Sequence, residues 1–167
     1  MVKNPWKDSM AFTDFAGTYH CTLDSKNRVN IPSGIRKMFL PQAEDTIVFA
    51  KGFEDINLYA YPLDEWHRLT QKLRTLNPFD KKTRDFIRLF MGSAHIAQMD
   101  GQGRIKLPDR ILKIAGIEKE LIIIGSLSKL EVWSPERYDT YIKEEKLSLP
   151  DLSEQISFTD MFFDEGA

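Results

Sequence analysis

The chain contains one ten-residue pattern twice. Residues 23–32, LDSKNRVNIP, and residues 99–108, MDGQGRIKLP, each hold an Asp, three turn-type residues, an Arg, two alternating apolar residues and a Pro. Corresponding positions are 76 residues apart throughout, as from Asp24 to Asp100. Two copies are too few for a solenoid, in which at least three repeats stack. The pattern therefore predicts a domain of two halves related by approximate twofold symmetry.

Similar elements follow both copies of the pattern. After each Pro the apolar residues have helical spacing, and two strands and a helix opened by a further Pro come next. The predicted strands cover residues 46–49, 58–59, 121–124 and 131–133, and the helices open at Pro62 and Pro135. Each half is thus predicted to contain a hairpin, a short helix, a second hairpin and a helix. Because a half of roughly 70 residues buries too little apolar surface to fold alone, we expect one α+β domain.

The first half has one additional predicted element, a helix over residues 80–91. Its apolar face, which is expected to be buried, consists of Phe86, Ile87 and Phe90. Arg84 and Arg88 lie four residues apart on one face of the same helix. That spacing suits contacts with an anion or another subunit, and it equally suits a face exposed to solvent.

The composition is typical of a globular protein. Hydrophobic residues make up 42% of the 167 residues, and no apolar run approaches the roughly 20 residues that cross a bilayer. The N-terminus lacks the basic and apolar segments of a secretory signal. Cys21 is the only cysteine, which excludes an internal disulfide. We therefore expect a cytoplasmic protein.

Acidic residues are concentrated at the C-terminus, although the net charge is only −2. Residues 150–167 contain five acidic residues and no Lys or Arg, which leaves 23 basic and 20 acidic residues in the rest of the chain. A mildly basic body is compatible with binding a polyanion, and also with a surface that only maintains solubility. The tail also contains Phe158, Phe162 and Phe163, so we expect residues 152–163 to dock on a subunit, either their own or a neighbour's. The alternative is a disordered end, as is common at chain termini.

Polar and apolar residues alternate along both copies of the pattern. Such alternation predicts strands with one buried and one exposed face. The buried face is expected to contain Tyr19, Cys21, Leu23, Val29, Ile31, Ala97, Met99, Ile105 and Leu107. Arg28 and Asn30 lie on the exposed face of the first half, and Arg104 and Lys106 lie on that of the second half.

The turn of each copy suits an Arg held in one direction. Asn27 and Gly103 occupy corresponding positions and are residue types that readily adopt positive φ. Asp24 and Asp100 can accept hydrogen bonds from turn amides, and each can brace the Arg four residues later. Such a pair can simply hold a hairpin together. Its duplication favours a function, because a guanidinium can donate two hydrogen bonds to guanine or phosphate.

The doubled block of Asp, turn, Arg, alternating apolar residues and Pro resembles the MraZ family of bacterial transcriptional regulators. It is similar, more distantly, to the AbrB-type swapped-hairpin DNA-binding domains. Further matching segments are LY at 58–59, PLDEW at 62–66, the spaced residues from Arg84 to Ala94, AGI at 115–117 and EVW at 131–133. The resemblance extends from about Phe15 to Tyr141, most of the chain.

The resemblance implies a fold and an assembly. The fold is α+β, with two pseudo-symmetric hairpin/helix repeats that form a double-psi or swapped-hairpin barrel with flanking helices. The implied parts are an N-terminal extension (1–14), a first repeat with a helical insertion (15–91), a second repeat (92–142) and an acidic, Phe-containing tail (143–167). Subunits are expected to close into a homo-oligomeric ring.

The resemblance also implies a function. It predicts a cytoplasmic, nucleoid-associated regulator that binds repeated promoter elements in double-stranded DNA ahead of the division and cell wall gene cluster. Carried over by position, the DNA-contacting residues are Arg28, Arg104, Lys26, Gln102, Asn30 and Lys106. The residues that support this motif are Asp24, Asp100, Asn27 and Gly103, of which Asn27 replaces the family's usual Gly.

Catalytic, metal and cofactor sites are not expected. His67 and His95 are isolated, and His20 and Cys21 face opposite sides of one strand, which is poor geometry for a metal site. A buried thiol is unreactive, and the chain has no P-loop or dinucleotide-binding motif. We expect no enzyme, small-molecule substrate or membrane partner. The alternative is a ring-forming protein-interaction module without specific DNA readout, whose binding should depend less on salt than phosphate contacts do.

Overall fold

The computed structural model describes residues 13–156 of the chain. It separates into two compact units, Met1–Pro135 and Glu136–Ala167, which we describe one at a time. No helix within residues 13–156 is long and apolar enough to span a membrane. The elements in chain order are β1 (Thr18–Thr22), β2 (Arg28–Asn30), α1 (Ser33–Arg36), the 3-10 helix η1 (Pro41–Ala43), β3 (Thr46–Lys51), β4 (Leu58–Pro62), α2 (Leu63–Arg74), α3 (Lys81–Ser93), β5 (His95–Gln98), β6 (Arg104–Lys106), α4 (Asp109–Ala115), β7 (Glu120–Ser126), β8 (Lys129–Trp133), α5 (Pro135–Glu144) and α6 (Leu149–Gln155).

The first unit contains a six-stranded antiparallel sheet with the order β1-β7-β8-β4-β3-β5. In the sequence repeat, β1 corresponds to β5, β3 to β7, and β4 to β8. The strand order is therefore unchanged when the two halves are exchanged. Each half adds its first strand to the hairpin of the other half, because β1 pairs with β7 and β5 pairs with β3.

This strand exchange corrects one expectation. The alternation around the two turns predicts a hairpin of the first two strands of each half. Instead, β1 pairs with β7, while β2 pairs with β6 in a separate two-stranded sheet. Alternation of polar and apolar residues predicts which face of a strand is buried, but it does not predict which strand pairs with it. The expected pairing was therefore wrong although the buried faces were predicted. The second hairpins, β3–β4 and β7–β8, are present as predicted.

The α+β class and the two repeats are present, but the expected barrel is not confirmed. The strands of residues 13–156 form one open six-stranded sheet and one two-stranded sheet, and no closed barrel is found among them. In the larger sheet, β1 and β5 are the two edges.

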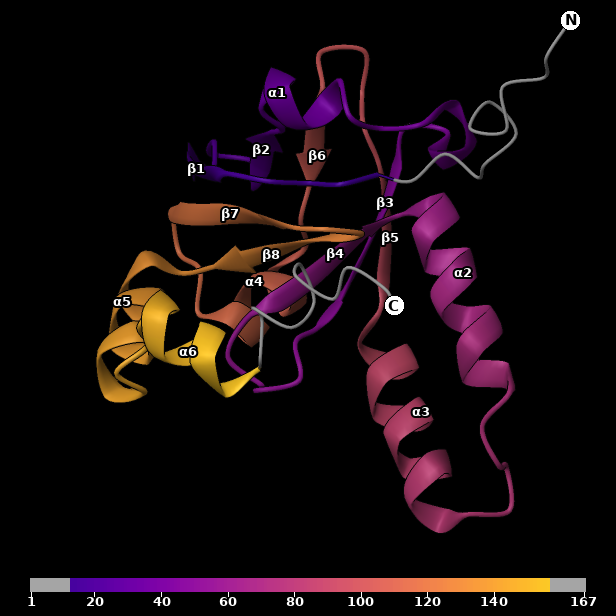
Figure 1. Cartoon of the computed structure of the whole chain (residues 1–167). Helices are drawn as coiled ribbons and strands as arrows, with labels where there is room; N and C mark the ends of the chain where they lie inside the picture. Colours follow the sequence, from indigo (N-terminus) through magenta and orange to yellow (C-terminus); the bar gives the residue numbers. More distant parts are fainter. Residues whose placement is uncertain (1–12, 157–167) are drawn as a thin grey trace, which may run out of the picture. The chain divides into compact units, whose positions relative to one another are not determined.

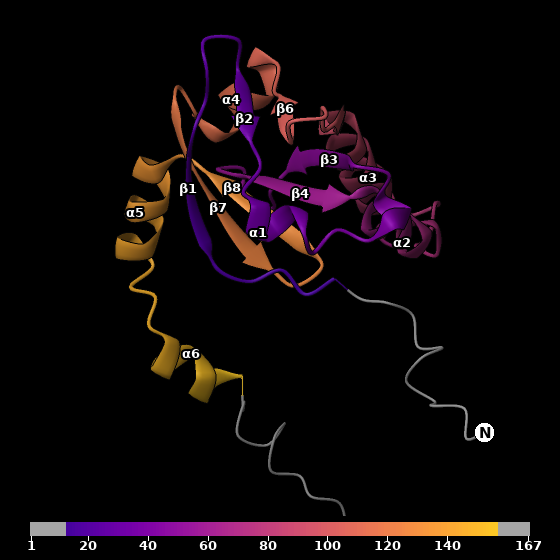
Figure 2. The ribbon, with the colours of Figure 1, turned by 90° about the horizontal axis from the view of Figure 1, so that it is seen from above.

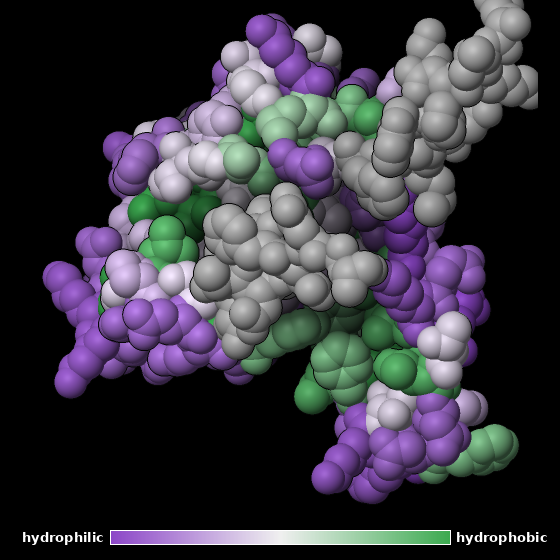
Figure 3. Space-filling model, in the orientation of Figure 1, coloured by the Kyte–Doolittle hydropathy of each residue, from purple (hydrophilic) through white to green (hydrophobic). Residues whose placement is uncertain are grey.

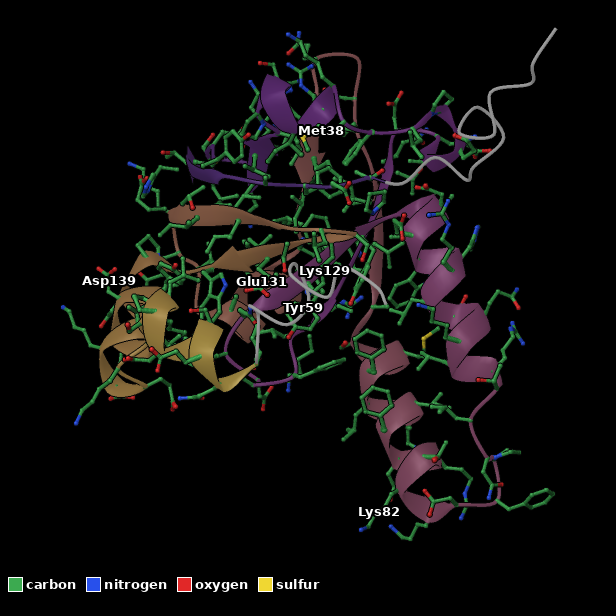
Figure 4. All side chains as sticks on the ribbon, viewed as in Figure 1. Met38, Tyr59, Lys82, Lys129, Glu131 and Asp139 are labelled. Carbon is green, nitrogen blue, oxygen red and sulfur yellow. The ribbon has the colours of Figure 1, made fainter. Side chains whose placement is uncertain are left out.

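The two halves meet at the centre of the large sheet, where β4 pairs with β8. Tyr59 of β4 lies opposite Glu131 of β8. The Nζ atom of Lys129 lies 4.7 Å from the centre of the Tyr59 ring and 3.7 Å from a carboxylate oxygen of Glu131 (Figure 4). Neither half therefore has a complete sheet without the other.

Two apolar cores lie on opposite faces of the large sheet. Along β3, Ile47 and Phe49 belong to the first core, and Val48 and Ala50 belong to the second. The first core also contains the apolar residues that run along β2 and β6 and just beyond them, which are at most 2% exposed: Val29, Ile31, Ile105 and Leu107. The two-stranded sheet is thus anchored by one face and leaves the other face outside (Figure 1).

The second core lies beneath α2 and α3. Trp66 of α2 and Phe90 of α3 pack with Val48, Tyr59 and Tyr61 of the sheet. Apolar spacing at three and four residues gives α2 one face for this core. Figure 1 shows α2 and α3 as neighbouring helices that extend beyond the sheet.

The predicted additional helix is present as α3. Asp80 precedes it, and one of its carboxylate oxygens accepts the backbone N–H of Thr83 at 2.8 Å, which is a standard N-cap. The buried face differs in part from the expectation. Phe90 is 5% exposed and Ile87 is half-buried, but Phe86 is 37% exposed.

The second unit contains α5 and α6. The first of these begins with Pro135 at its first position, as predicted from the preference of Pro for that position. The second follows Ser148 and was not predicted. Residues 1–12 of the expected N-terminal extension lie outside the described residues. The same holds for residues 157–163 of the segment that is predicted to dock, whereas Leu152 of this segment lies in α6.

Candidate nucleic-acid interface

The pairing of β2 with β6 brings the predicted polar residues of both halves together. Arg28 lies opposite Lys106, and Asn30 lies opposite Arg104. Side chains alternate along a strand, so all four lie on the same outward face of this ribbon. The middle pair points into the first core and is at most 1% exposed: Val29 and Ile105.

Asp24 holds the first arginine in place. Its Oδ1 atom accepts the backbone N–H groups of Lys26 at 2.8 Å and Arg28 at 2.9 Å. Its Oδ2 atom accepts the Nε–H of Arg28 at 2.7 Å. One carboxylate therefore both closes the turn and orients the guanidinium, as predicted.

Asp100 makes the same contacts in the second half. Its Oδ1 atom accepts the backbone N–H groups of Gln102 at 2.9 Å and Arg104 at 3.0 Å, and its Oδ2 atom accepts the Nε–H of Arg104 at 2.8 Å. The side chains of Arg104 and Arg28 are each 31% exposed. Within residues 13–156, their Nη1 and Nη2 groups have no hydrogen-bond partner. Each fork is fixed in direction and is available for two parallel hydrogen bonds.

The same hydrogen bonds keep both carboxylates ionised. The backbone N–H of Arg28, together with its side chain and the N–H of Lys26, lowers the pKa of Asp24 to about 2. The backbone N–H of Arg104 is the main cause that lowers the pKa of Asp100. Hydrogen bonds to the charged form favour that form, so each arginine keeps an anionic partner at neutral pH.

Each turn is held by the opposite half. The N–H of Ile31 donates to the carbonyl of Gly103, and the N–H of Leu107 donates to the carbonyl of Asn27, both at 2.9 Å. The φ angles are 55° at Asn27 and 77° at Gly103, as the residue types predict. These reciprocal bonds continue the ribbon beyond its paired strands.

Two residues at these turns were missed by sequence reasoning. The Nδ2–H of Asn27 donates to Oδ1 of Asp109 at 2.7 Å, in the first turn of α4, which Figure 2 shows beside the loop between β1 and β2. At the other turn, a Cβ atom on Gly103 would lie only 2.5 Å from Nη1 of Arg36 at the end of α1. The repeat shows which residues correspond, but it does not show that each turn contacts the helix of the other half.

The remaining candidates extend the same basic surface. Lys26 and Gln102 occupy corresponding exposed positions in the two turns. Within the described part of the chain, the side chains of Lys26 and Lys106 form no hydrogen bond or ion pair. Since Asp24 and Asp100 offset two of the four positive charges, the ribbon face keeps a positive balance. It can bind phosphates and the acceptor edges of bases.

Other reactive groups lie apart from this face. Cys21 is half-buried against the first core, and burial raises the pKa of its thiol. A thiol in such surroundings is a poor nucleophile. Residues 13–156 contain no group of three or more His, Cys, Asp or Glu residues arranged to hold a metal ion.

Both repeats match the same family model, described as "MraZ protein, putative antitoxin-like", over residues 15–89 and 89–156. The two matches together cover most of the chain. The chain belongs to the MraZ family. The two matched segments each contain one copy of the Asp–Arg turn, so the sequence repeat and the family repeat coincide.

Curated MraZ relatives match over nearly their whole length. A protein of Christiangramia forsetii is 32% identical over 146 residues, which are 87% of this chain and 94% of the relative. A protein of Clostridium beijerinckii is 38% identical over 143 residues, 86% of this chain and 96% of the relative. A protein of Clostridium botulinum is 39% identical over 127 residues, 76% of this chain and 86% of the relative. All three are named Transcriptional regulator MraZ, which is not an enzyme class.

Proposed function

We propose that this chain is a sequence-specific DNA-binding regulator of transcription that contacts DNA through the outward face of β2 and β6. The observation that carries this proposal is the pair of clamped arginines. In each half, an Asp engages the Nε of Arg28 or Arg104 and leaves the two Nη groups without a partner among residues 13–156. That fork matches the O6 and N7 acceptors of guanine, and it also matches a phosphate.

The arrangement of charge supports a polyanionic partner. Arg28 lies directly opposite Lys106 across the ribbon. Like charges at directly opposite positions destabilise an antiparallel pair. A bound polyanion reduces that repulsion, so this arrangement of charge is more favourable when DNA is bound to the surface. A two-stranded ribbon also has the dimensions that the major groove admits.

Different residues take different roles in the proposed complex. Arg28 and Arg104 contact base edges, and Lys26 and Lys106 contact phosphates. The amides of Asn30 and Gln102 are suited to base edges or to the backbone. Asp24 and Asp100 act as positioning residues for the two forks, and Asn27 and Gly103 shape the turns that present them.

We further propose that several copies act together as a homo-oligomeric ring on repeated promoter elements ahead of the division and cell wall gene cluster, at the nucleoid in the cytoplasm. One chain presents two arginine turns, which are few contacts for tight binding at physiological salt, and linking copies raises the overall affinity. The reciprocal pairing of β1 with β7 and of β2 with β6 supports interleaved, swapped-hairpin repeats within residues 15–142.

The test is a titration of fluorescently labelled DNA from the region upstream of the gene, with a shuffled duplex as the competitor control. We expect preferential binding of the upstream duplex, with an affinity that falls steeply as salt rises. The Arg28→Ala/Arg104→Ala variant should lose that preference while keeping the circular dichroism of the wild type. Equal binding of both duplexes by the wild type, or an unchanged preference in the variant, would refute specific readout and favour the protein-interaction alternative.

A further inference from the structure

An apolar groove of the first unit lies between α3, α4 and the loop after β3. Its volume is about 750 Å³, within the range of about 300–1,000 Å³ that is usual for ligand pockets. Its apolar lining consists of Phe53, Phe86, Leu89, Phe90 and Ile114. None of these residues belongs to the β2–β6 ribbon, so the proposed DNA contact leaves the groove unexplained.

The groove exposes side chains that are costly to leave in water. Leu89 is 73% exposed, Phe53 is 63% exposed and Phe86 is 37% exposed. Figure 3 shows apolar side chains on the surface over the sheet-proximal part of α3, with hydrophilic ones beside them. A contiguous exposed apolar patch with a polar rim is typical of an interaction site.

The aromatic rings of this groove are already ordered. The rings of Phe86 and Phe90 are stacked with centroids 5.7 Å apart and an interplanar angle of 6°. Phe53 packs against Phe86 edge-on at 5.7 Å, and against Tyr59 at 5.2 Å. The rings hold one another in place, so an incoming apolar side chain meets a preformed surface and little ordering is needed on binding.

Three basic residues lie beside the apolar lining. Lys51, Arg88 and Arg110 line the groove beside a single acidic residue, Asp55. Lys51 pairs with that aspartate, and Arg88 pairs with Asp85. The guanidinium of Arg110 donates to the carbonyl of Ala94, and no carboxylate of residues 13–156 lies within salt-bridge distance of it. Arg110 is therefore the one rim cation that no carboxylate of residues 13–156 balances, and its charge favours an acidic partner.

The C-terminal segment of the chain has the complementary composition. Residues 157–167, SFTDMFFDEGA, contain three Phe, one Met and three acidic residues, with no Lys or Arg. Its aromatic residues match the ring-lined groove, and its carboxylates match the basic rim. No other stretch of the chain outside the described residues has this composition, because residues 1–12 contain two Lys and one Asp.

We propose that residues 157–167 of a neighbouring copy of this chain bind in the groove between α3 and α4. The inference rests on the oligomer of the proposed function: a tail that occupies the groove of the next copy links the copies. The Phe side chains enter the apolar part of the groove, and an acidic residue of the tail pairs with Arg110. Through Arg110 the bound tail contacts α4, whose first residue, Asp109, holds the first DNA-contacting turn.

The first test measures the tail as a peptide. A labelled peptide of residues 157–167 is titrated with the full-length chain carrying Phe158→Ser, Phe162→Ser and Phe163→Ser, which leaves the groove open. We expect saturable binding. Adding Leu89→Asp should weaken it by about tenfold or more, because the change places a carboxylate in the apolar lining beside an acidic peptide. Phe79→Asp is the matched control, since Phe79 is 89% exposed outside the groove, and it should leave the affinity unchanged.

The second test measures mass by light scattering coupled to size exclusion. The tail variant and Leu89→Asp should each lower the mass of the assembly, whereas Phe79→Asp should not. A peptide that does not bind, or that binds Leu89→Asp as tightly as its control, would overturn the proposal. An unchanged mass with a bound peptide would place the tail in the groove of its own chain and also contradict it. The preference for the promoter duplex is measured separately on the same variants. If the peptide and mass tests fail while this preference is retained, the docking of the tail is refuted and the proposed DNA binding is not.

Discussion

Replacing Asp100 by Asn separates the two tasks of this carboxylate. Asn keeps an oxygen that can accept the backbone N–H groups of Gln102 and Arg104, so the turn is preserved. Its Nδ2 group then faces the Nε–H of Arg104, and two donors cannot bond to each other. The variant is therefore expected to fold normally but to release the arginine from its fixed direction.

The magnitude follows from the freedom that Arg104 regains. Immobilising a side chain with many rotamers on binding costs about 0.5–1.5 kcal/mol, and the clamp places that cost in folding rather than in DNA binding. Its loss should weaken specific DNA binding by roughly 2- to 12-fold. Arg104→Ala removes the contact itself and should cost about 1–3 kcal/mol. Asp100→Asn should therefore be the milder of the two variants.

Removing a negative charge beside DNA also favours binding to any sequence, so affinity for one duplex is an incomplete measurement. The assay is fluorescence anisotropy with the promoter duplex and a shuffled duplex, and the ratio of the two affinities is compared. Asp100→Asn should lower the ratio while the melting temperature stays close to that of the wild type. An unchanged ratio would show that the clamp does not prepare Arg104 for DNA. A lower melting temperature with a normal ratio would make the clamp purely structural.

Three further outcomes follow from the same geometry. Gly103→Ala places a side chain at φ 77° and should lower the free energy of unfolding by about 1–2 kcal/mol in chemical denaturation. Gly101→Ala is the control in the same turn and should not lower it, because a Cβ atom at Gly101 meets no other atom within 4 Å. Ile105 is fully buried in the first core, so Ile105→Ala should lower the free energy of unfolding by about 2–5 kcal/mol in the same experiment. A variant as stable as the wild type would contradict the anchoring of the ribbon by this core. The pKa of Asp24 in the folded chain, about 2, lies below the ordinary value of about 3.9. The ionised carboxylate therefore stabilises the fold above about pH 4, and this contribution disappears as the pH falls toward 2. In urea denaturation across that window, the free energy of unfolding should fall less in Asp24→Asn than in the wild type.

Much of the candidate site was predictable because its geometry is local. The spacing of Asp24 and Arg28 lets one carboxylate reach both the turn amides and the guanidinium, and the hydrogen bonds are as predicted. Positive φ at Asn27 and Gly103 follows from residue type alone. Burial of the alternate residues of β2 and β6 follows from the period of a strand.

What the sequence could not predict depends on contacts between distant segments. Alternation along β1 and β2 is the same whether they pair with each other or, as here, with β7 and β6. The contacts of Arg36 with the second turn and of Asp109 with the first exist only because the halves exchange strands. Phe86 has the helical spacing of a buried residue, but it lines the groove beside α3. Phe53, which packs against it, lies in a loop, where no periodic pattern predicts the position of a side chain.

The most direct measurement is the specificity of the Arg28→Lys/Arg104→Lys variant. Lys keeps both positive charges but has no planar fork, so phosphate attraction remains and two-bond recognition is lost. Salt-dependent titrations of the promoter and shuffled duplexes should give a salt slope close to that of the wild type and a specificity ratio that falls toward one. A variant that still prefers the promoter duplex as strongly as the wild type would contradict the claim that the two clamped arginines read DNA.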